Sequence, residues 1–165
     1  IDALRADPNA VYGCNIAAAS AVLDSAWLAI FRRLEREPSV AARLVVEITE
    51  TEPLNPVAGR AFVHRFRQAG CRVAIDDFGV GYSALNNLVV GNPDIVKLDR
   101  SVLSLIKRNA IGRYQFRRLI AFAHENARHV VVEGVENELD REILVDSGVA
   151  WAQGIRFSWR SPAAA

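Results

Sequence analysis

Side chains that could bind metal ions stand at the ends of successive apolar runs in this chain of 165 residues. They are the amide Asn15 and the carboxylates Glu47, Asp76, Asp77 and Glu133. Oxygens of this kind are the ligands that hard divalent cations such as Mg²⁺ and Mn²⁺ prefer, whereas zinc favours nitrogen and sulfur. Four carboxylates at one opening repel each other strongly unless cations neutralise them. The pattern therefore predicts a site for Mg²⁺ or Mn²⁺.

The adjacent pair Asp76 and Asp77 predicts two ions, because each carboxylate can face a different one. Two ions clamp the attacking and leaving oxygens of a phosphoryl displacement. Lys97 ends a further apolar run, two residues before Asp99, and can orient a water molecule or offset charge on a phosphate. The alternative for any single acid is a cap or turn residue of the next helix. Four such acids with a lysine favour a metal site.

The elements that must position these side chains alternate between short strands and longer helices. The short aliphatic runs predict strands that are buried on both faces, which is typical of parallel sheets. Apolar residues at helical spacing predict helices over 22–35, 55–70, 114–126 and 139–147. This alternation predicts an α/β domain with right-handed crossovers.

Six such strand–helix units can be counted, and the last, weak strand near 150–155 carries Gln153. A (β/α)8 barrel needs eight units and about 250 residues, and its active site lies at the carboxyl ends of the strands. We therefore expect residues 1–165 to form an incomplete TIM-barrel-like domain whose first two strands would precede Ile1. The absence of methionine also predicts a piece of a longer protein, and 161–165 has the composition of a tail.

The composition is that of a single globular domain. Hydrophobic residues make up 51% of the chain and charged residues 24%, which supports a packed core. The net charge of +1 argues against binding of a nucleic-acid polymer through bulk charge. The two cysteines, Cys14 and Cys71, are too few for a disulfide framework and fit a reducing compartment. No run is long enough to span a membrane, and no signal peptide is evident.

One glycine motif suggests a different chemistry. Residues 79–84 read GVGYSA, which fits the dinucleotide-binding fingerprint G-x-G-x-x-A, and Asp99 lies where a ribose-binding acid belongs. However, Asp76 and Asp77 would repel a pyrophosphate at that turn. The two glycines instead favour a loop over the strand ends that can gate a site.

Several segments together resemble the EAL domain family along essentially the whole chain. They are EITE at 47–50, IDDFGVGYSAL at 75–85, PDIVKLD at 93–99, VEGVE at 132–136, and QG at 153–154 followed by Pro162. The resemblance implies a (β/α)8 TIM-barrel-like fold with one reversed strand. It also implies a cyclic di-GMP-specific phosphodiesterase that hydrolyses c-di-GMP to the linear dinucleotide pGpG with two Mg²⁺ or Mn²⁺ ions.

The resemblance also implies roles for individual residues. The implied metal-site residues are Asn15, Glu47, Asp76, Asp77 and Glu133. The implied catalytic residues are Lys97, Glu133 and Asp77, with Lys97 similar to the lysine that positions the attacking water. Glu50 is similar to the acid that holds the loop of residues 78–85 in place. Asp99, Glu136 and Gln153 are similar to residues that support the site.

The chain departs from the family pattern in ways that bear on activity. The Glu-Ala-Leu motif, whose glutamate is a metal ligand in the family, is absent, and its strand would precede Ile1. The family's Asn-Leu-Ser reads Asn15-Ile16-Ala17, which removes a hydroxyl. Enzymatic activity therefore stays open. The alternatives are a catalytically impaired EAL-type c-di-GMP receptor and a signalling or docking module. An enolase-type barrel also uses acids and a lysine but does not explain the Asp76–Asp77 pair.

As a family member, the chain would act in the bacterial cytoplasm in signalling. The implied partners are cyclic di-GMP, a second copy of the chain in a homodimer, and an upstream sensor, receiver or diguanylate-cyclase (GGDEF) domain.

Overall fold

Six parallel strands form one sheet in the computed structural model, which describes residues 1–49, 53–78, 86, 89–106 and 110–157. The strands are β1 (Tyr12–Ala17), β2 (Leu44–Thr49), β3 (Arg72–Phe78), β4 (Ile95–Leu98), β5 (His129–Val132) and β6 (Trp151–Ala152). They lie in sequence order across the sheet, and each pairs in parallel with the next. The predicted α/β fold with six parallel strands is confirmed.

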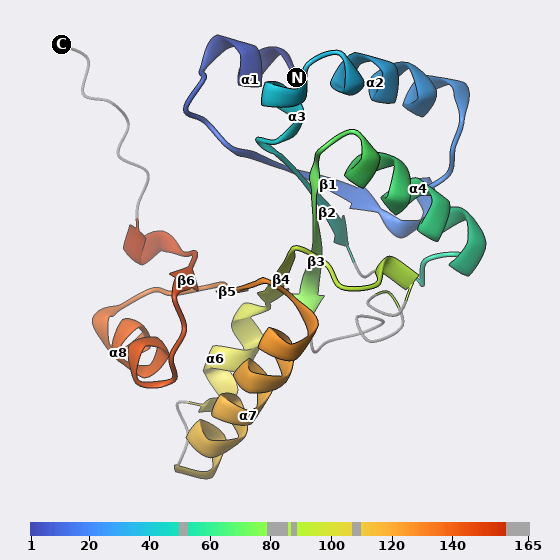
Figure 1. The fold of residues 1–165 in the computed structure, drawn as a ribbon. Helices are drawn as coiled ribbons and strands as arrows, with labels where there is room; N and C mark the ends of the chain where they lie inside the picture. The colour runs from blue at the N-terminus through green and yellow to red at the C-terminus, as the bar shows by residue number, and fades with distance from the viewer. Residues whose placement is uncertain (50–52, 79–85, 87–88, 107–109, 158–165) are drawn as a thin grey trace, which may run out of the picture.

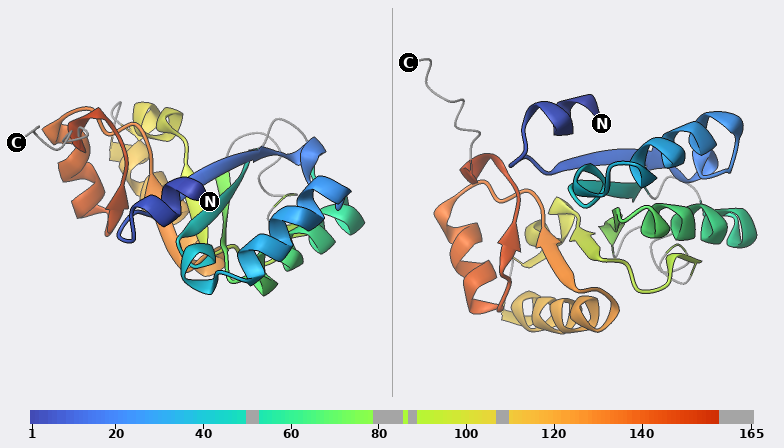
Figure 2. Two further views of the ribbon diagram at one scale, coloured as in Figure 1. Left: turned by 90° about the horizontal axis from the view of Figure 1, so that it is seen from above. Right: turned by 45° about the horizontal axis from the view of Figure 1, so that its top comes forward.

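Helices lie around the outside of the strands (Figure 1), and two further views show the same arrangement (Figure 2). The described helices are α1 (Asp2–Ala6), α2 (Ser25–Glu35), α3 (Pro38–Ala41), α4 (Pro56–Gln68), α6 (Arg100–Ile106), α7 (Ala110–Asn126) and α8 (Glu138–Asp146). Two short 3-10 helices, η1 (Ala18–Ser20) and η2 (Ile155–Phe157), complete the described elements. The four helices that the apolar spacing predicts are confirmed as α2, α4, α7 and α8, with ends displaced by a few residues. The spacing did not predict α1, α3 and α6, because helices of four to seven residues have too few turns to show a period.

Side-chain caps determine where three of the helices begin. The Asp24 carboxylate accepts a hydrogen bond from the Trp27 N–H at the start of α2. The Asn55 side chain accepts from two N–H groups at the start of α4. The Asn137 side chain accepts a hydrogen bond from the Asp140 N–H at the start of α8. Each cap satisfies N–H groups that have no partner within the helix.

An aromatic cluster fills the space between α2 and α4. Its members are Trp27, Phe31, Phe62 and Phe66, with ring centroids 4.7 to 6.3 Å apart in edge-on or tilted pairs. Phe31, Phe62 and Phe66 are fully buried. Phe31 and Phe62 come from sequence segments that both show helical apolar spacing, so the two apolar faces meet here.

The strands differ in how well they are covered. Strands β2, β3 and β4 are mostly buried, as parallel strands with both faces covered should be. In β1, by contrast, residues 12–15 are all exposed, and only Ile16 is buried. Strand β1 pairs on one side with β2 and forms one edge of the sheet.

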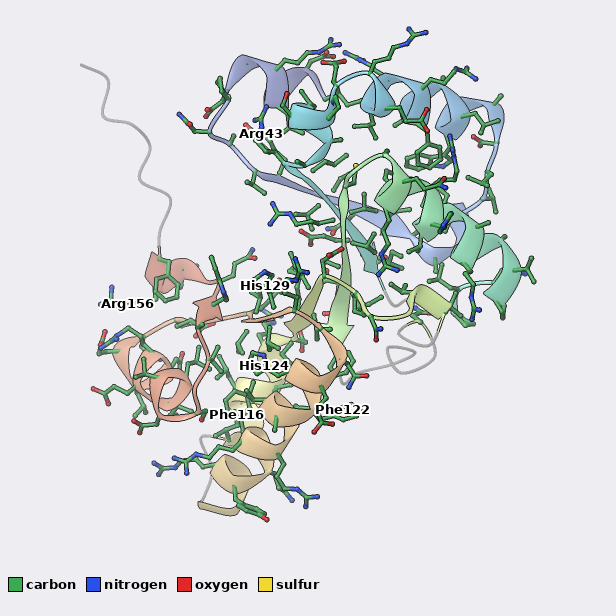
Figure 3. The ribbon with its side chains drawn as sticks, in the orientation of Figure 1. Arg43, Phe116, Phe122, His124, His129 and Arg156 are labelled. Atoms are coloured by element: carbon green, nitrogen blue, oxygen red, sulfur yellow. The ribbon has the colours of Figure 1, made fainter. Side chains whose placement is uncertain are left out.

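One arginine anchors the segment before β1. The Arg43 guanidinium, labelled in Figure 3, donates hydrogen bonds to the carbonyl oxygens of Leu4, Asp7 and Ala10 at 2.6 to 3.0 Å. Arg33 and Glu37 form ion pairs with Asp2 and Arg5 of α1. Helix α1 is therefore held by side chains from α2 and from the residues that follow it.

No helix in the described part of the chain is both long enough and apolar enough to cross a membrane.

Candidate functional site

Lys97 lies at the centre of the predicted site. It belongs to β4, and its side chain is only 11% exposed. Its ammonium nitrogen Nζ is 2.8 Å from Glu47 Oε2, 3.1 Å from Asp76 Oδ1 and 2.5 Å from Glu133 Oε1. These carboxylates come from β2, from β3 and from the residue after β5. The structure thus brings together four of the residues that the sequence predicts.

The contacts keep Lys97 protonated. Burial disfavours the ammonium, but hydrogen bonds to Glu133 and Glu47 and the charge of Asp76 outweigh that cost, so the pKa of Lys97 lies above its usual range. Three carboxylates nevertheless carry more formal negative charge than one ammonium can balance. A further cation would be favoured here.

An irregularity in β3 separates the two adjacent aspartates. The register of β3 against β4 shifts between Ile75 and Phe78, and Asp77 has a φ of 52°, in the left-handed region. A non-glycine residue in this region is strained, and such strain is commonly found at functional sites. The irregularity breaks the simple alternation of side chains, so Asp76 and Asp77 need not point to opposite faces of the sheet.

The Asp77 carboxyl is partly buried and has two other carboxylates near it. Burial raises the pKa of this carboxyl, and the charges of Asp76 and Asp99 raise it further, while Lys97 partly opposes them. Among the described ion pairs, the Lys97 ammonium contacts Asp76 and not Asp77. The two carboxylates therefore face different surroundings.

A cleft of about 680 Å³ joins the first and last strands over this cluster. Its lining includes Tyr12, Gly13, Asn15, Glu47, Lys97 and Gln153. Asn15 on β1 is the register partner of Glu47 on β2, which places both at the same level of the sheet. The predicted residues Asn15 and Gln153 thus share one cleft with Glu47 and Lys97.

Sequence reasoning missed Gly13 as a residue of this cleft. A Cβ atom built on Gly13 would lie 2.0 Å from Glu47 Oε1. A glycine inside a strand often marks such a close approach, and Gly13 stands two residues before Asn15. That signal was available in the sequence.

The predicted supporting residues take separate positions. The Asp99 carboxylate accepts a hydrogen bond from the Ser101 N–H at 2.8 Å, and bonding to Ser101 holds the pKa of Asp99 below its usual value. The Glu136 N–H donates to the buried Asp140 carboxylate. The Glu136 side chain lines a different cavity, of about 290 Å³. Glu50, the loop of residues 79–85 and Pro162 lie outside the described residues.

The histidines are placed elsewhere. His129 on β5 packs edge-on against Trp151, with ring centroids 5.9 Å apart. His124 comes from α7, and the two histidines lie apart in Figure 3. His64 lines a cavity on the outer face of α4. None of them contributes to the contacts of Lys97.

The donor set around Lys97 fits a hard divalent cation in its chemistry. Glu47, Asp76 and Glu133 offer only oxygen, and each has an oxygen within 3.1 Å of one positive centre. Within the described ranges, however, no three acidic, imidazole or thiol side chains already surround a common point as metal ligands. The Lys97 ammonium stands where these carboxylates need a cation. A metal ion would therefore bind by taking over carboxylate oxygens that now face Lys97.

Parallel strands that alternate with helices define an α/β domain, and barrels of this class build their active sites at the carboxyl ends of the strands, where these acids lie. The EAL domain family model matches residues 2–159, so the chain belongs to the EAL domain family. The fold and the resemblance stated from the sequence are confirmed.

Known members give the same assignment. The cyclic di-GMP phosphodiesterase RocR of Pseudomonas aeruginosa is 34% identical over 120 residues, which cover 72% of this chain and 31% of that protein. The EAL domain protein of Listeria monocytogenes superposes with a TM-score of 0.73 at 29% identity, covering 90% of this chain and 60% of that one. Klebsiella pneumoniae BlrP1, solved as a complex with manganese and cyclic di-GMP, gives a TM-score of 0.74 at 25% identity, covering 93% and 39%. The chain thus spans less than two thirds of each.

Proposed function

We propose that this chain is a cyclic di-GMP phosphodiesterase domain that hydrolyses c-di-GMP to pGpG. The observation that carries the proposal is the convergence of Glu47, Asp76 and Glu133 on Lys97, at the carboxyl ends of neighbouring parallel strands. Relatives that are named cyclic di-GMP phosphodiesterases support the substrate. The manganese and calcium complexes of BlrP1 support a divalent cation.

In this proposal, two Mg²⁺ or Mn²⁺ ions are held by side-chain oxygens at the carboxyl ends of the strands. The residues that would hold them are Asn15, Glu47, Asp76, Asp77 and Glu133. When bound, such ions activate a water molecule and neutralise charge on the phosphate. Gln153 lines the cleft, and Asp99 and Glu136 follow the strand ends, where they would support the ligands. Glu50 would hold the loop that follows β3.

The chain's own residues would then act on water and phosphate. Lys97 would donate a hydrogen bond from Nζ to the oxygen of the attacking water and fix its direction. Glu133 would accept the proton of that water at a carboxylate oxygen. The water oxygen forms a bond to phosphorus as the bond from phosphorus to the 3′ oxygen breaks, and the proton passes to that 3′ oxygen. One water is consumed, and pGpG carries the new 5′ phosphate.

Strands from outside residues 1–165 would complete the barrel. The exposed residues 12–15 of β1 support this part of the proposal, because an exposed parallel edge has N–H and C=O groups available for another strand. A strand carrying the family's Glu-Ala-Leu motif would add a further carboxylate to the cleft. By the same resemblance, the domain would work as a homodimer in the bacterial cytoplasm, joined to a sensor, receiver or GGDEF domain.

A second candidate is a c-di-GMP receptor without turnover. One observation favours it: the Lys97 ammonium already pairs with three carboxylates, so the cluster is partly neutralised without a metal. A receptor needs the cleft and the strand ends but not a site that binds metal tightly.

Turnover and binding measured on the same preparation separate these functions. The chain is incubated with c-di-GMP and Mn²⁺, the products are separated by chromatography, and binding is measured by calorimetry. Formation of pGpG that stops when Mn²⁺ is chelated supports the phosphodiesterase. Binding without product supports the receptor. Neither binding nor product would contradict both for residues 1–165.

A further inference from the structure

The Glu47 side chain occupies space that a side chain at position 13 would take. Glu47 and Gly13 are not register partners, since Gly13 stands opposite Val45 and Asn15 stands opposite Glu47. The Glu47 side chain therefore leans back along the sheet and lies over the bare backbone of Gly13. A Cβ atom on Gly13 would be 2.0 Å from Oε1 and 2.9 Å from Cδ of Glu47.

The same carboxylate reaches Lys97 through its other oxygen. Glu47 Oε2 is 2.8 Å from Lys97 Nζ, while Oε1 lies over Gly13. Asp76 and Glu133 contact the same ammonium. The place of Glu47 beside these two carboxylates thus depends on the empty space above Gly13.

A Cβ atom at position 13 would displace the Glu47 carboxylate and would not disturb the fold. The atoms in the way are the far end of a flexible side chain, which can turn aside. The backbone at Gly13 is not in the left-handed region that favours glycine, so alanine is compatible with its conformation. Alanine also leaves the charge of the cleft unchanged.

We propose that Gly13 is a positioning residue of the cation site, because its lack of a side chain lets Glu47 lie with Asp76 and Glu133 around Lys97. Gly13→Ala turns the Glu47 carboxylate away and weakens divalent-cation binding through Glu47. The metal part of this inference rests on the proposed function. The contact between Glu47 and Lys97 does not, and it can be measured without metal.

The neighbouring residue provides a matched control. Strand side chains alternate between faces, so Cys14 points away from the cleft. It lines a second cavity of about 450 Å³, together with Trp27 and Ile30, and none of these three residues lines the cleft, although Tyr12 and Gly13 border both. Cys14→Ala changes the same strand by a similar small amount without touching Glu47.

The first experiment follows Lys97 in the metal-free protein. The sequence contains two lysines, Lys97 and Lys107, so ¹⁵N-lysine NMR gives few side-chain ammonium signals, and Lys97→Met assigns the one from Lys97. We expect Gly13→Ala to shift that signal and Cys14→Ala to leave it in place. In a Glu47→Ala background, Gly13→Ala should cause no additional shift. An unshifted Lys97 signal in a folded Gly13→Ala protein overturns the inference.

The second experiment measures Mn²⁺ affinity by calorimetry on the same variants. Loss of a group that orients a metal ligand typically costs about 10- to 100-fold in affinity. We expect a loss of this size in Gly13→Ala, none in Cys14→Ala, and partial recovery in Gly13→Ala/Glu47→Asp, whose shorter side chain clears the added methyl group. Affinity unchanged in Gly13→Ala would overturn the metal role. If the unsubstituted chain binds no Mn²⁺ while the NMR shift is seen, the proposed metal site fails and the positioning of Glu47 by Gly13 stands.

Discussion

Two clusters of side chains in the molecule differ in chemistry: the cluster between α2 and α4 is aromatic, and the cluster around Lys97 is charged. Between α2 and α4, Trp27, Phe31, Phe62 and Phe66 pack ring against ring, and the three buried phenylalanines have no polar side-chain atom to satisfy. Over the strand ends, Lys97 gathers three carboxylates, and one positive charge faces three negative ones. The aromatic cluster carries no charge, whereas the charges of the carboxylate cluster are balanced only in part.

We therefore expect the aromatic cluster to matter for stability and the Lys97 cluster to matter for function. Aromatic contacts are apolar and do not depend on bound ions, so the aromatic cluster should contribute to folding under all conditions. The energy of the Lys97 cluster depends on which cation its carboxylates face. Substitutions in the two clusters should therefore respond differently to divalent metal.

The largest expected effect is on turnover, from Asp76→Asn. Replacing one carboxylate oxygen with an amide nitrogen removes an oxygen from the proposed metal site and should abolish the proposed c-di-GMP hydrolysis, while the thermal unfolding midpoint of the metal-free protein changes little. Asp146→Asn, an exposed acid at the end of α8, is the matched control and should retain full activity. Full activity in Asp76→Asn would show that Asp76 is not a metal ligand.

Phe62→Ala should produce the largest loss of stability. Removing a fully buried ring from a packed cluster costs about 3–5 kcal/mol of unfolding free energy. Urea unfolding measures the loss, and saturating Mn²⁺ should stabilise this variant by the same amount as the unsubstituted chain. A much larger Mn²⁺ effect in Phe62→Ala would mean that the two clusters are not independent.

Lys97→Met should destabilise the metal-free protein by about 3 kcal/mol, because it leaves partly buried carboxylates without their cation. Mn²⁺ should recover much of the loss, since a ligand at about 100 times its Kd stabilises by about 2.7 kcal/mol. Unfolding midpoints with and without Mn²⁺ test this, and Phe62→Ala is the control. An equal Mn²⁺ effect in Lys97→Met and in the unsubstituted chain would contradict competition between lysine and metal.

The smallest effect concerns the two thiols. Burial raises the pKa of the Cys71 thiol to about 11, so it stays protonated at neutral pH and gains thiolate only as the pH approaches that value. Cys14 is exposed on β1. A thiol reagent at neutral pH should label one cysteine in the native chain and both after unfolding, and Cys14→Ala should remove the native reaction. Rapid native labelling in Cys14→Ala would show that Cys71 is accessible.

The sequence predicted the parts of this molecule that depend on local pattern. Alternating apolar runs identified the strands, and the acids that follow them identified Glu47, Asp76 and Glu133 as neighbours at one end of the sheet. The metal and catalytic roles of all the site residues, Glu47, Asp76 and Glu133 included, stay predictions, since the structure places the residues without testing their chemistry.

Features that depend on distant contacts could not be predicted in this way. Lys97 and Glu47 are 50 residues apart in the chain, and their contact depends on how far the sheet curves between β2 and β4. The place of Glu47 over Gly13 depends on the direction in which a flexible side chain leans across a neighbouring strand. The strained backbone of Asp77 follows from the register shift against β4, which no periodicity in β3 reveals.

The hydrogen bonds of Arg43 set an order of events during synthesis. Its guanidinium binds the carbonyl oxygens of Leu4, Asp7 and Ala10, more than thirty residues earlier in the chain. On the ribosome the chain emerges from its amino end, so α1 and the turn after it leave the exit tunnel before Arg43 does, and these contacts cannot form until Arg43 has emerged as well. The segment that leads into the exposed strand β1 should therefore dock only when β2 is made, which gives any other strand time to reach the edge of β1 first.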